Sequence, residues 1–218
     1  MALHPPVHIG NVIRNAVVFK PKKRDGSLMN TDSLLFSVER LLVLLRERKI
    51  DFVLVGGIAL LQYVEGRNTE DIDLIMALSS LKKLPEIHLT SQDVNFARGT
   101  FENLQIDFLL TSNPLFAKVQ RQHTTPQVFA EQTIPTATVD GLILLKLYAL
   151  PSLYRHGNFP KVGIYENDVA TLLYAYRPDM AGLIKALSRF LDPHDLKEVE
   201  GIVGEIQGRI ARFRLAGG

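Results

Sequence analysis

Two aspartates inside an apolar segment are the residues of this chain whose types and spacing could do chemistry. The stretch DIDLIM places Asp71 and Asp73 two residues apart among aliphatic side chains. Because side chains two apart in a strand point to the same face, the two carboxylates project together. Neighbouring carboxylates repel each other unless a cation neutralises them, and ligands made of oxygen alone suit Mg²⁺ or Mn²⁺. A lone pair of this kind is more often the acidic solvent face of a half-buried strand.

Two further features favour a cation site. Gly56 and Gly57 lie where an apolar strand, DFVLV, turns into a helix, and glycine there lets backbone N–H groups approach a phosphate. A simple tight turn is the alternative explanation of the glycines. The segment LQIDFLL places Asp107 in another apolar strand. If the two strands are neighbours, Asp107 lies beside Asp71 and Asp73, and three carboxylates in one cleft could serve two-metal phosphoryl or nucleotidyl transfer.

The order of these features resembles the nucleotidyltransferase superfamily of the DNA polymerase β type. Within that superfamily, the run from Val53 to Met76 is similar to the abortive-infection-type nucleotidyltransferase-like toxins, which carry Gly-Gly followed by Arg-x-Thr-x-Asp-h-Asp. The residues of this chain that match the second part of the pattern are Arg67, Thr69, Asp71 and Asp73. Asp107 is the third acid of the same resemblance.

The resemblance implies a role for each of the matching residues. Asp71 and Asp73 would bind both metal ions, and Asp107 would bind one of them. Asp107 could also accept the proton of an acceptor hydroxyl as a general base. Gly56 and Gly57 would hold the nucleoside triphosphate, which is the substrate that the resemblance implies.

Three further residues are candidates for nucleotide binding. Arg67 either contacts a phosphate or pairs with Glu65 or Glu70. Lys146 lies in the apolar helical stripe LILLKLYAL, so it either snorkels to solvent or, as in the similar helix of the toxins, offsets charge on the nucleotide phosphates. Asp168, in YENDVATLL, resembles the last acidic element of the family and could pair with Lys146 and position it.

The stretch before Asp168 departs from the family. The Lys/Arg-Asp pair that the family carries just ahead of this aspartate is missing, and the longer stretch PSLYRHGNFPKVGIYEND stands in its place. We predict a loop between two helices there. The alternative is an acceptor-contacting segment, with the candidate residues Tyr154, Arg155, His156 and Lys161.

The pattern along the chain predicts an α/β nucleotidyltransferase core, with a small mixed sheet flanked by helices, followed by a C-terminal helical unit. The predicted parts are a basic N-terminal extension (1–30), the core (31–123) and the helical unit (124–218). Within the core we expect a hairpin in which Val94–Phe96 turns through Gly99 into Leu104–Leu110. Residues 125–139 are predicted to be an irregular or strand-like connection, followed by four helices at about 140–150, 165–176, 180–191 and 195–214.

The composition excludes several classes of site. The 218 residues include no cysteine, which excludes disulfides, thiolate zinc sites and cysteine nucleophiles. The six histidines have no zinc-site spacing, no P-loop motif is present, and a net charge of +2 is too small to argue nucleic-acid binding. The first residues lack an apolar core of signal-peptide length, and the apolar runs are too short to span a bilayer. We therefore expect a soluble, cytoplasmic protein with no membrane partner.

Two classes of function remain. The first is a Mg²⁺-dependent nucleotidyltransferase that moves an NMP from an NTP to an acceptor hydroxyl. The resemblance implies a tRNA 3′ end as acceptor and a toxin role, with a cognate antitoxin, in a toxin–antitoxin or phage-defence pair, whereas related folds modify small molecules such as antibiotics. The second class is a non-catalytic nucleotidyltransferase-like module that binds a partner protein or RNA. The presence of all three acids and both glycines argues against it.

Overall fold

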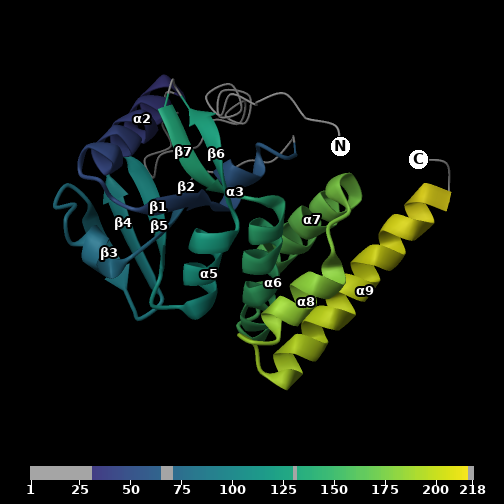
Figure 1. Cartoon of the computed structure of the whole chain (residues 1–218). Coiled ribbons are helices and arrows are strands. Elements are labelled where there is room, and N and C mark those ends of the chain that lie inside the picture. Colours follow the sequence, from purple (N-terminus) through teal and green to yellow (C-terminus); the bar gives the residue numbers. More distant parts are fainter. Residues whose placement is uncertain (1–30, 65–70, 130–131, 216–218) are drawn as a thin grey trace. The chain divides into compact units, whose positions relative to one another are not determined.

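The computed structural model describes residues 31–64, 71–129 and 132–215 (Figure 1). The chain divides into two compact units, Met1–Thr138 and Val139–Gly218. The basic extension predicted at 1–30 and the candidate phosphate ligand Arg67 lie outside the described residues.

The first unit is built on a seven-stranded mixed sheet with the strand order β3-β4-β5-β2-β1-β7-β6. The strands are β1 (Phe52–Val55), β2 (Asp71–Met76), β3 (His88–Gln92), β4 (Phe96–Phe101), β5 (Leu104–Leu110), β6 (Thr124–Phe129) and β7 (Gln132–Ala137). β2 lies at the centre of the sheet, parallel to β5 and antiparallel to β1. This order makes β2 and β5, which carry the three candidate acids, direct neighbours.

Four helices of the first unit are described: α2 (Thr31–Glu47), α3 (Gly56–Leu60), α4 (Leu78–Leu81) and α5 (Pro114–Gln122). α2 buries an apolar face, with Leu41 and Leu45 fully buried. α5 begins directly after Asn113, whose side chain accepts a hydrogen bond from the Leu115 N–H at 2.9 Å, and Pro114 occupies the first turn.

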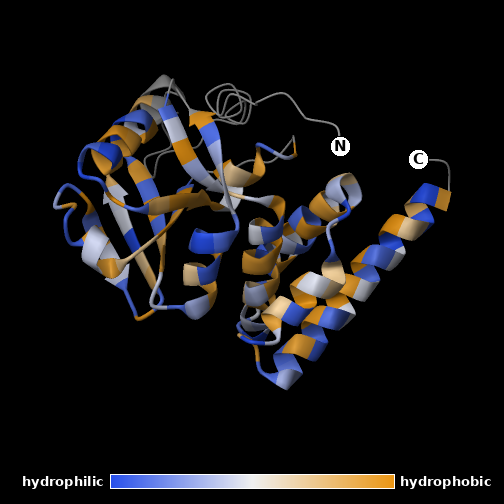
Figure 2. Ribbon diagram, viewed as in Figure 1, coloured by the Kyte–Doolittle hydropathy of each residue, from blue (hydrophilic) through white to orange (hydrophobic). Residues whose placement is uncertain are grey.

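The core of the first unit lies along the central strands. Figure 2 shows apolar residues along β1 and β2, where Ile72, Leu74, Ile75 and Met76 are all inaccessible to solvent. Such a nearly continuous buried run is typical of a central strand that is covered on both faces. Asp71 and Asp73 interrupt this run on the face opposite to Ile72 and Leu74, and both are half-buried.

The second unit is helical, as the sequence predicts. Its helices are α6 (Val139–Arg155), α7 (Phe159–Tyr176), α8 (Met180–Leu187) and α9 (Pro193–Leu215). Asn158 caps α7 and Asp179 caps α8, each accepting a hydrogen bond from a backbone N–H of the first turn. Within 31–64, 71–129 and 132–215, no helix combines the length and the apolar character that crossing a bilayer needs.

The predicted hairpin is placed wrongly in the sequence analysis. Gly99 is not at a turn but inside β4, where it pairs with Ile106. A Cβ at this position would lie 2.9 Å from the backbone oxygen of His88, so the glycine allows β3 to approach β4 closely. The turn falls at Glu102, which takes the left-handed conformation with φ 54°. β3 was not predicted, because all its residues are exposed and show no apolar alternation.

The described residues of the segment predicted as an irregular or strand-like connection form two antiparallel strands, β6 and β7. β7 joins the sheet of the first unit beside β1, whereas the prediction grouped the segment with the helical unit. Another segment differs from its prediction. The stretch predicted as a loop before Asp168 is mostly helix. α6 continues through Pro151 to Arg155, and α7 begins at Phe159. The connection between the two helices is therefore only three residues long, 156–158.

Candidate active site

The sheet register brings the three candidate acids together. β2 and β5 run parallel with Asp73 opposite Asp107, and Asp71 lies two residues earlier on the same face. Each of the three side chains offers a carboxylate oxygen, and these oxygens all lie within 4.8 Å of one another. We call Asp71, Asp73 and Asp107 the acid cluster.

The glycine turn lies directly against the acid cluster. The last residue of β1, Val55, pairs with Asp73, so Gly56 follows beside that carboxylate. A Cβ on residue 56 would overlap Oδ2 of Asp73, and the φ of +66° is one that only glycine adopts readily. Gly57 is buried in the short helix α3 that follows. The glycine turn and the acids therefore lie together. Residue 56 has to be glycine because any side chain there would clash with Asp73.

Arg98 completes the electrostatics of the acid cluster. It lies on β4 opposite Asp107 and donates two hydrogen bonds to that carboxylate, from Nε to Oδ1 and from Nη2 to Oδ2, both at 2.6 Å. The hydrogen bonding to Asp107 raises the pKa of Arg98, burial opposes the rise, and the charges of Asp107, Asp71 and Asp73 add to it. All three carboxylates of the acid cluster thus stabilise the charged form of the Arg98 guanidinium.

Arg98 was not among the site residues predicted from the sequence. Its only signal is the hairpin register, which requires the correct turn position. With the turn at Glu102, Phe101 pairs with Leu104. Three residues further from the turn on each strand, Arg98 of β4 therefore lies opposite Asp107 of β5.

The donor set of the acid cluster fits a divalent cation. It consists of oxygen atoms alone, it comes from two adjacent central strands, and its carboxylates would repel one another without a positive charge. Mg²⁺ and Mn²⁺ take ligands of this kind. The function of these residues as metal ligands stays a prediction.

The second unit contains the ion pair that the sequence analysis anticipated. Nζ of Lys146 donates to Oδ2 of Asp168 at 2.7 Å, and both side chains are at least 95% buried. The ammonium also lies 4.4 Å from the ring centroid of Tyr165. Lys146 therefore does not snorkel to solvent but is fixed between α6 and α7. Its proposed contact with nucleotide phosphates stays a prediction, as does that of Asp168.

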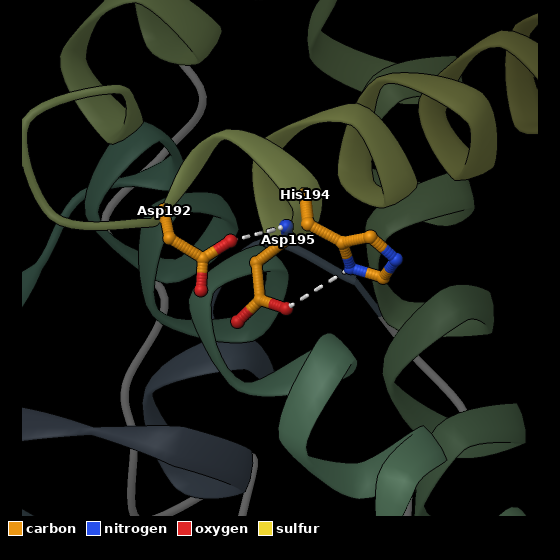
Figure 3. Close-up of side chains that lie close together, drawn as sticks. All are labelled: Asp192, His194 and Asp195. Atoms are coloured by element: carbon orange, nitrogen blue, oxygen red, sulfur yellow. Dashed lines mark hydrogen bonds and ion pairs between the residues drawn. The ribbon is translucent and has the colours of Figure 1, made fainter.

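Another acidic group lies at the start of α9 (Figure 3). Asp192 caps the helix, because its Oδ1 accepts a hydrogen bond from the Asp195 N–H at 2.9 Å. Asp195 forms an ion pair with Arg155 of α6, and Nδ1 of His194 lies 3.9 Å from Asp195. Helix capping and an ion pair thus account for this group, and we assign no metal to it.

Comparison with known proteins identifies the fold. No protein-family model matches the chain, and neither does any curated protein. The solution structure of the antibiotic-resistance factor ANT(2'')-Ia is similar, with a TM-score of 0.51 and 13% identity, over 86% of this chain and 98% of that chain. The crystal structure of an antigenic nucleotidyltransferase-like protein from Paracoccidioides brasiliensis gives a TM-score of 0.49 and 17% identity, over 78% of this chain and 93% of that one.

At such low identity the likeness to ANT(2'')-Ia concerns the fold alone. The chain has a nucleotidyltransferase-like α/β fold, with a mixed sheet, flanking helices and a C-terminal set of helices. This confirms the predicted fold class. The particular closeness to abortive-infection-type toxins stays a prediction.

Proposed function

We propose that the chain is a Mg²⁺-dependent nucleotidyltransferase that moves an NMP from an NTP to an acceptor hydroxyl. The observation that carries the proposal is the convergence of three strand carboxylates beside a glycine turn, on a nucleotidyltransferase-like fold. Two acids on one strand would not support the proposal. The acid cluster does, because its residues come from two strands that are distant in sequence and become neighbours in the fold.

Each residue has a role in this proposal. Asp71, Asp73 and Asp107 hold the divalent cations, and Gly56 and Gly57 let the backbone approach the triphosphate. When bound, the cations neutralise charge on the phosphates and on the leaving group. The acids also place the acceptor hydroxyl, since a carboxylate can orient it by accepting its hydrogen bond.

The proposed transfer balances as a single displacement. The acceptor oxygen forms a bond to the α-phosphorus, while the bond from that phosphorus to the bridging oxygen breaks and pyrophosphate leaves with the electron pair. Asp107 accepts the proton of the acceptor hydroxyl as general base. Both oxygens of Asp107 accept hydrogen bonds from Arg98. Asp107 can therefore accept the proton only if the guanidinium releases at least one of these hydrogen bonds.

Lys146 is proposed as a source of positive charge for the triphosphate, and Asp168 as the residue that positions it, on the resemblance alone. Within the helical unit the ammonium is held by the Asp168 carboxylate and lies over the ring of Tyr165. A fixed charge stabilises a transition state without reorganising, as a mobile surface lysine does not. Arg67 is proposed as a further phosphate ligand on the motif alone.

Two acceptor classes are included. The motif shared with abortive-infection-type toxins supports a tRNA 3′ end, with the protein acting as a toxin held in check by an antitoxin. The similar fold of an antibiotic-resistance factor supports the hydroxyl of a small molecule. Both acceptors present a hydroxyl to the same acid cluster.

Label transfer tests the proposal and sorts the acceptors. The protein is incubated with each α-labelled NTP and Mg²⁺, together with total RNA or with a panel of antibiotics that carry hydroxyl groups. We expect label to move to one acceptor class, and to be lost in Asp71→Asn and Asp73→Asn. Asp51→Asn, which changes an exposed aspartate just before β1, is the matched control and should keep activity. Absence of transfer to every acceptor, together with absence of metal-dependent NTP binding, would reject the enzyme.

A non-catalytic binding module is the second candidate. The observation that favours it is the bidentate ion pair, since Arg98 already neutralises one acid of the cluster. This candidate predicts nucleotide binding, measured by equilibrium dialysis, that persists in EDTA and in Asp73→Asn. The enzyme predicts that both treatments weaken binding.

A further inference from the structure

We propose that Arg98 is a positioning residue that competes with the divalent cation for Asp107 and thereby sets the cation affinity of the acid cluster. The inference rests on the proposed function, because it concerns the same site. It adds a residue that the motif does not contain and that the fold places there.

The first step is geometric. The guanidinium fork engages both oxygens of Asp107 at 2.6 Å, which fixes the plane of the carboxylate and occupies one lone pair of each oxygen. A cation shared with Asp71 and Asp73 has to use the remaining lone pairs of Asp107 or displace the guanidinium. In both cases the position of Arg98 determines which lone pairs of Asp107 the cation can use.

The second step is electrostatic. Three carboxylates within 4.8 Å of one another attract any cation strongly, and Arg98 already satisfies part of that attraction. A guanidinium and a divalent cation on one carboxylate also repel each other. The free protein should therefore bind a divalent cation more weakly than three carboxylates alone would.

The third step concerns how readily the pair opens. The Arg98 side chain is 48% exposed, whereas that of Asp107 is only 17% exposed. A guanidinium that is half in solvent can swing out into water, because it regains hydration when it leaves the carboxylate. Asp107 is fixed by the strand and stays. The pair is thus built so that the arginine leaves and the acid remains.

Cation affinity measured without nucleotide or acceptor tests this inference. Free Mn²⁺ is quantified by electron paramagnetic resonance during titration of the wild type, Arg98→Met and Arg98→Lys. We expect Arg98→Met to bind Mn²⁺ about tenfold more tightly, since removing one adjacent positive charge shifts a carboxylate equilibrium by at least that much. Arg98→Lys keeps the charge but loses the fork, so its affinity should lie between the two.

Two controls make the result specific. Arg121→Met removes one positive charge from an exposed position on α5 and should leave Mn²⁺ affinity unchanged. In an Asp107→Asn background, Arg98→Met should change the affinity by less than about threefold, because the competition runs through Asp107. Circular dichroism checks that each variant is folded, and Arg98→Lys provides the test if Arg98→Met does not fold.

The outcomes separate the inference from the proposed function. If Arg98→Met binds Mn²⁺ as tightly as the wild type does, or more weakly, Arg98 only supports the structure and the inference is overturned. The proposed function still stands in that case if Mn²⁺ binding is lost in Asp71→Asn. If neither protein binds Mn²⁺, both fail. Mn²⁺ binding that is tighter in Arg98→Met than in the wild type, and unchanged in Arg121→Met, supports the inference.

Discussion

At the scale of single residues, Gly56 is the position where backbone and acid cluster constrain each other most. A methyl group there would overlap Oδ2 of Asp73, and the left-handed φ would strain any other residue. We predict that Gly56→Ala lowers the free energy of unfolding by about 1–3 kcal/mol and lowers label transfer at least about tenfold, because Asp73 has to move. Chemical denaturation and the transfer assay measure the two effects.

The control for this change is a glycine with free space around it. Gly163 lies in α7, and a Cβ there would meet nothing within 4 Å. Gly163→Ala should raise the free energy of unfolding by about 0.5–1 kcal/mol. If both substitutions shift stability in the same direction, the contact with Asp73 is not what requires glycine at residue 56.

The buried ion pair between Lys146 and Asp168 gives a second prediction at this scale. Lys146→Met leaves the Asp168 carboxylate buried without the ammonium, so we expect a loss of about 3–5 kcal/mol in the free energy of unfolding. The double variant Lys146→Met/Asp168→Leu should lose less than the sum of the two single changes, since it removes both charges. Strict additivity in urea denaturation would show that the pair does not act as a unit.

Sequence reasoning found the acids and the lysine because their apolar neighbours mark them. Asp71, Asp73, Asp107 and Lys146 all lie next to buried apolar side chains along the chain, which is a local signal. The importance of Arg98 comes from a partner nine residues away across a hairpin, so only the register reveals it.

At the scale of elements, the errors came from glycine and proline. Gly99 was interpreted as a turn, but it serves the close approach of β3, and Pro151 lies inside α6 without ending it. Both residues break regular structure by propensity, and packing decides whether they do so in a given place. Asn113 and Pro114 at the start of α5 act as their propensities predict, because the Asn113 side chain caps the helix and Pro114 occupies its first turn.

The end of α7 offers a prediction at this scale. Arg177 terminates the helix in the left-handed conformation, with φ 49° and ψ 55°, while its N–H bonds to the Leu173 oxygen. Glycine is the residue that adopts this conformation without strain. Arg177→Gly should therefore raise the free energy of unfolding by about 1 kcal/mol, and Arg177→Ala should bring no such gain. Thermal unfolding of both variants measures the difference, and equal effects would contradict the explanation by backbone strain.

At the scale of the whole molecule, strand pairing decides to which unit a segment belongs. The strands after residue 123 belong to the first unit because β7 pairs with β1, with Leu54 opposite Thr136. A parallel pair between segments so far apart in sequence leaves no local mark. The same is true of β2 and β5, whose adjacency was a condition of the predicted site and is now observed.

The division into two units predicts where a cation stabilises the protein. All three acids belong to the first unit, so Mn²⁺ binding should stabilise that unit. At one hundred times its Kd, a ligand that binds only the folded state adds about 2.7 kcal/mol. We expect hydrogen exchange in β2 and β5 to slow by up to about a hundredfold with Mn²⁺, and exchange in α7 and α9 to stay unchanged.

Asp71→Asn is the control for this experiment, and it should remove the protection of β2 and β5 without altering exchange in the helical unit. Equal slowing of both units in the wild type would mean that they unfold as one, and it would contradict the prediction. Slowing confined to α9 would instead place the cation at Asp192 and Asp195, against the capping and ion-pair explanation of those residues. Peptide-resolved mass spectrometry distinguishes these patterns, because the two acidic groups lie in separate units and in separate peptides.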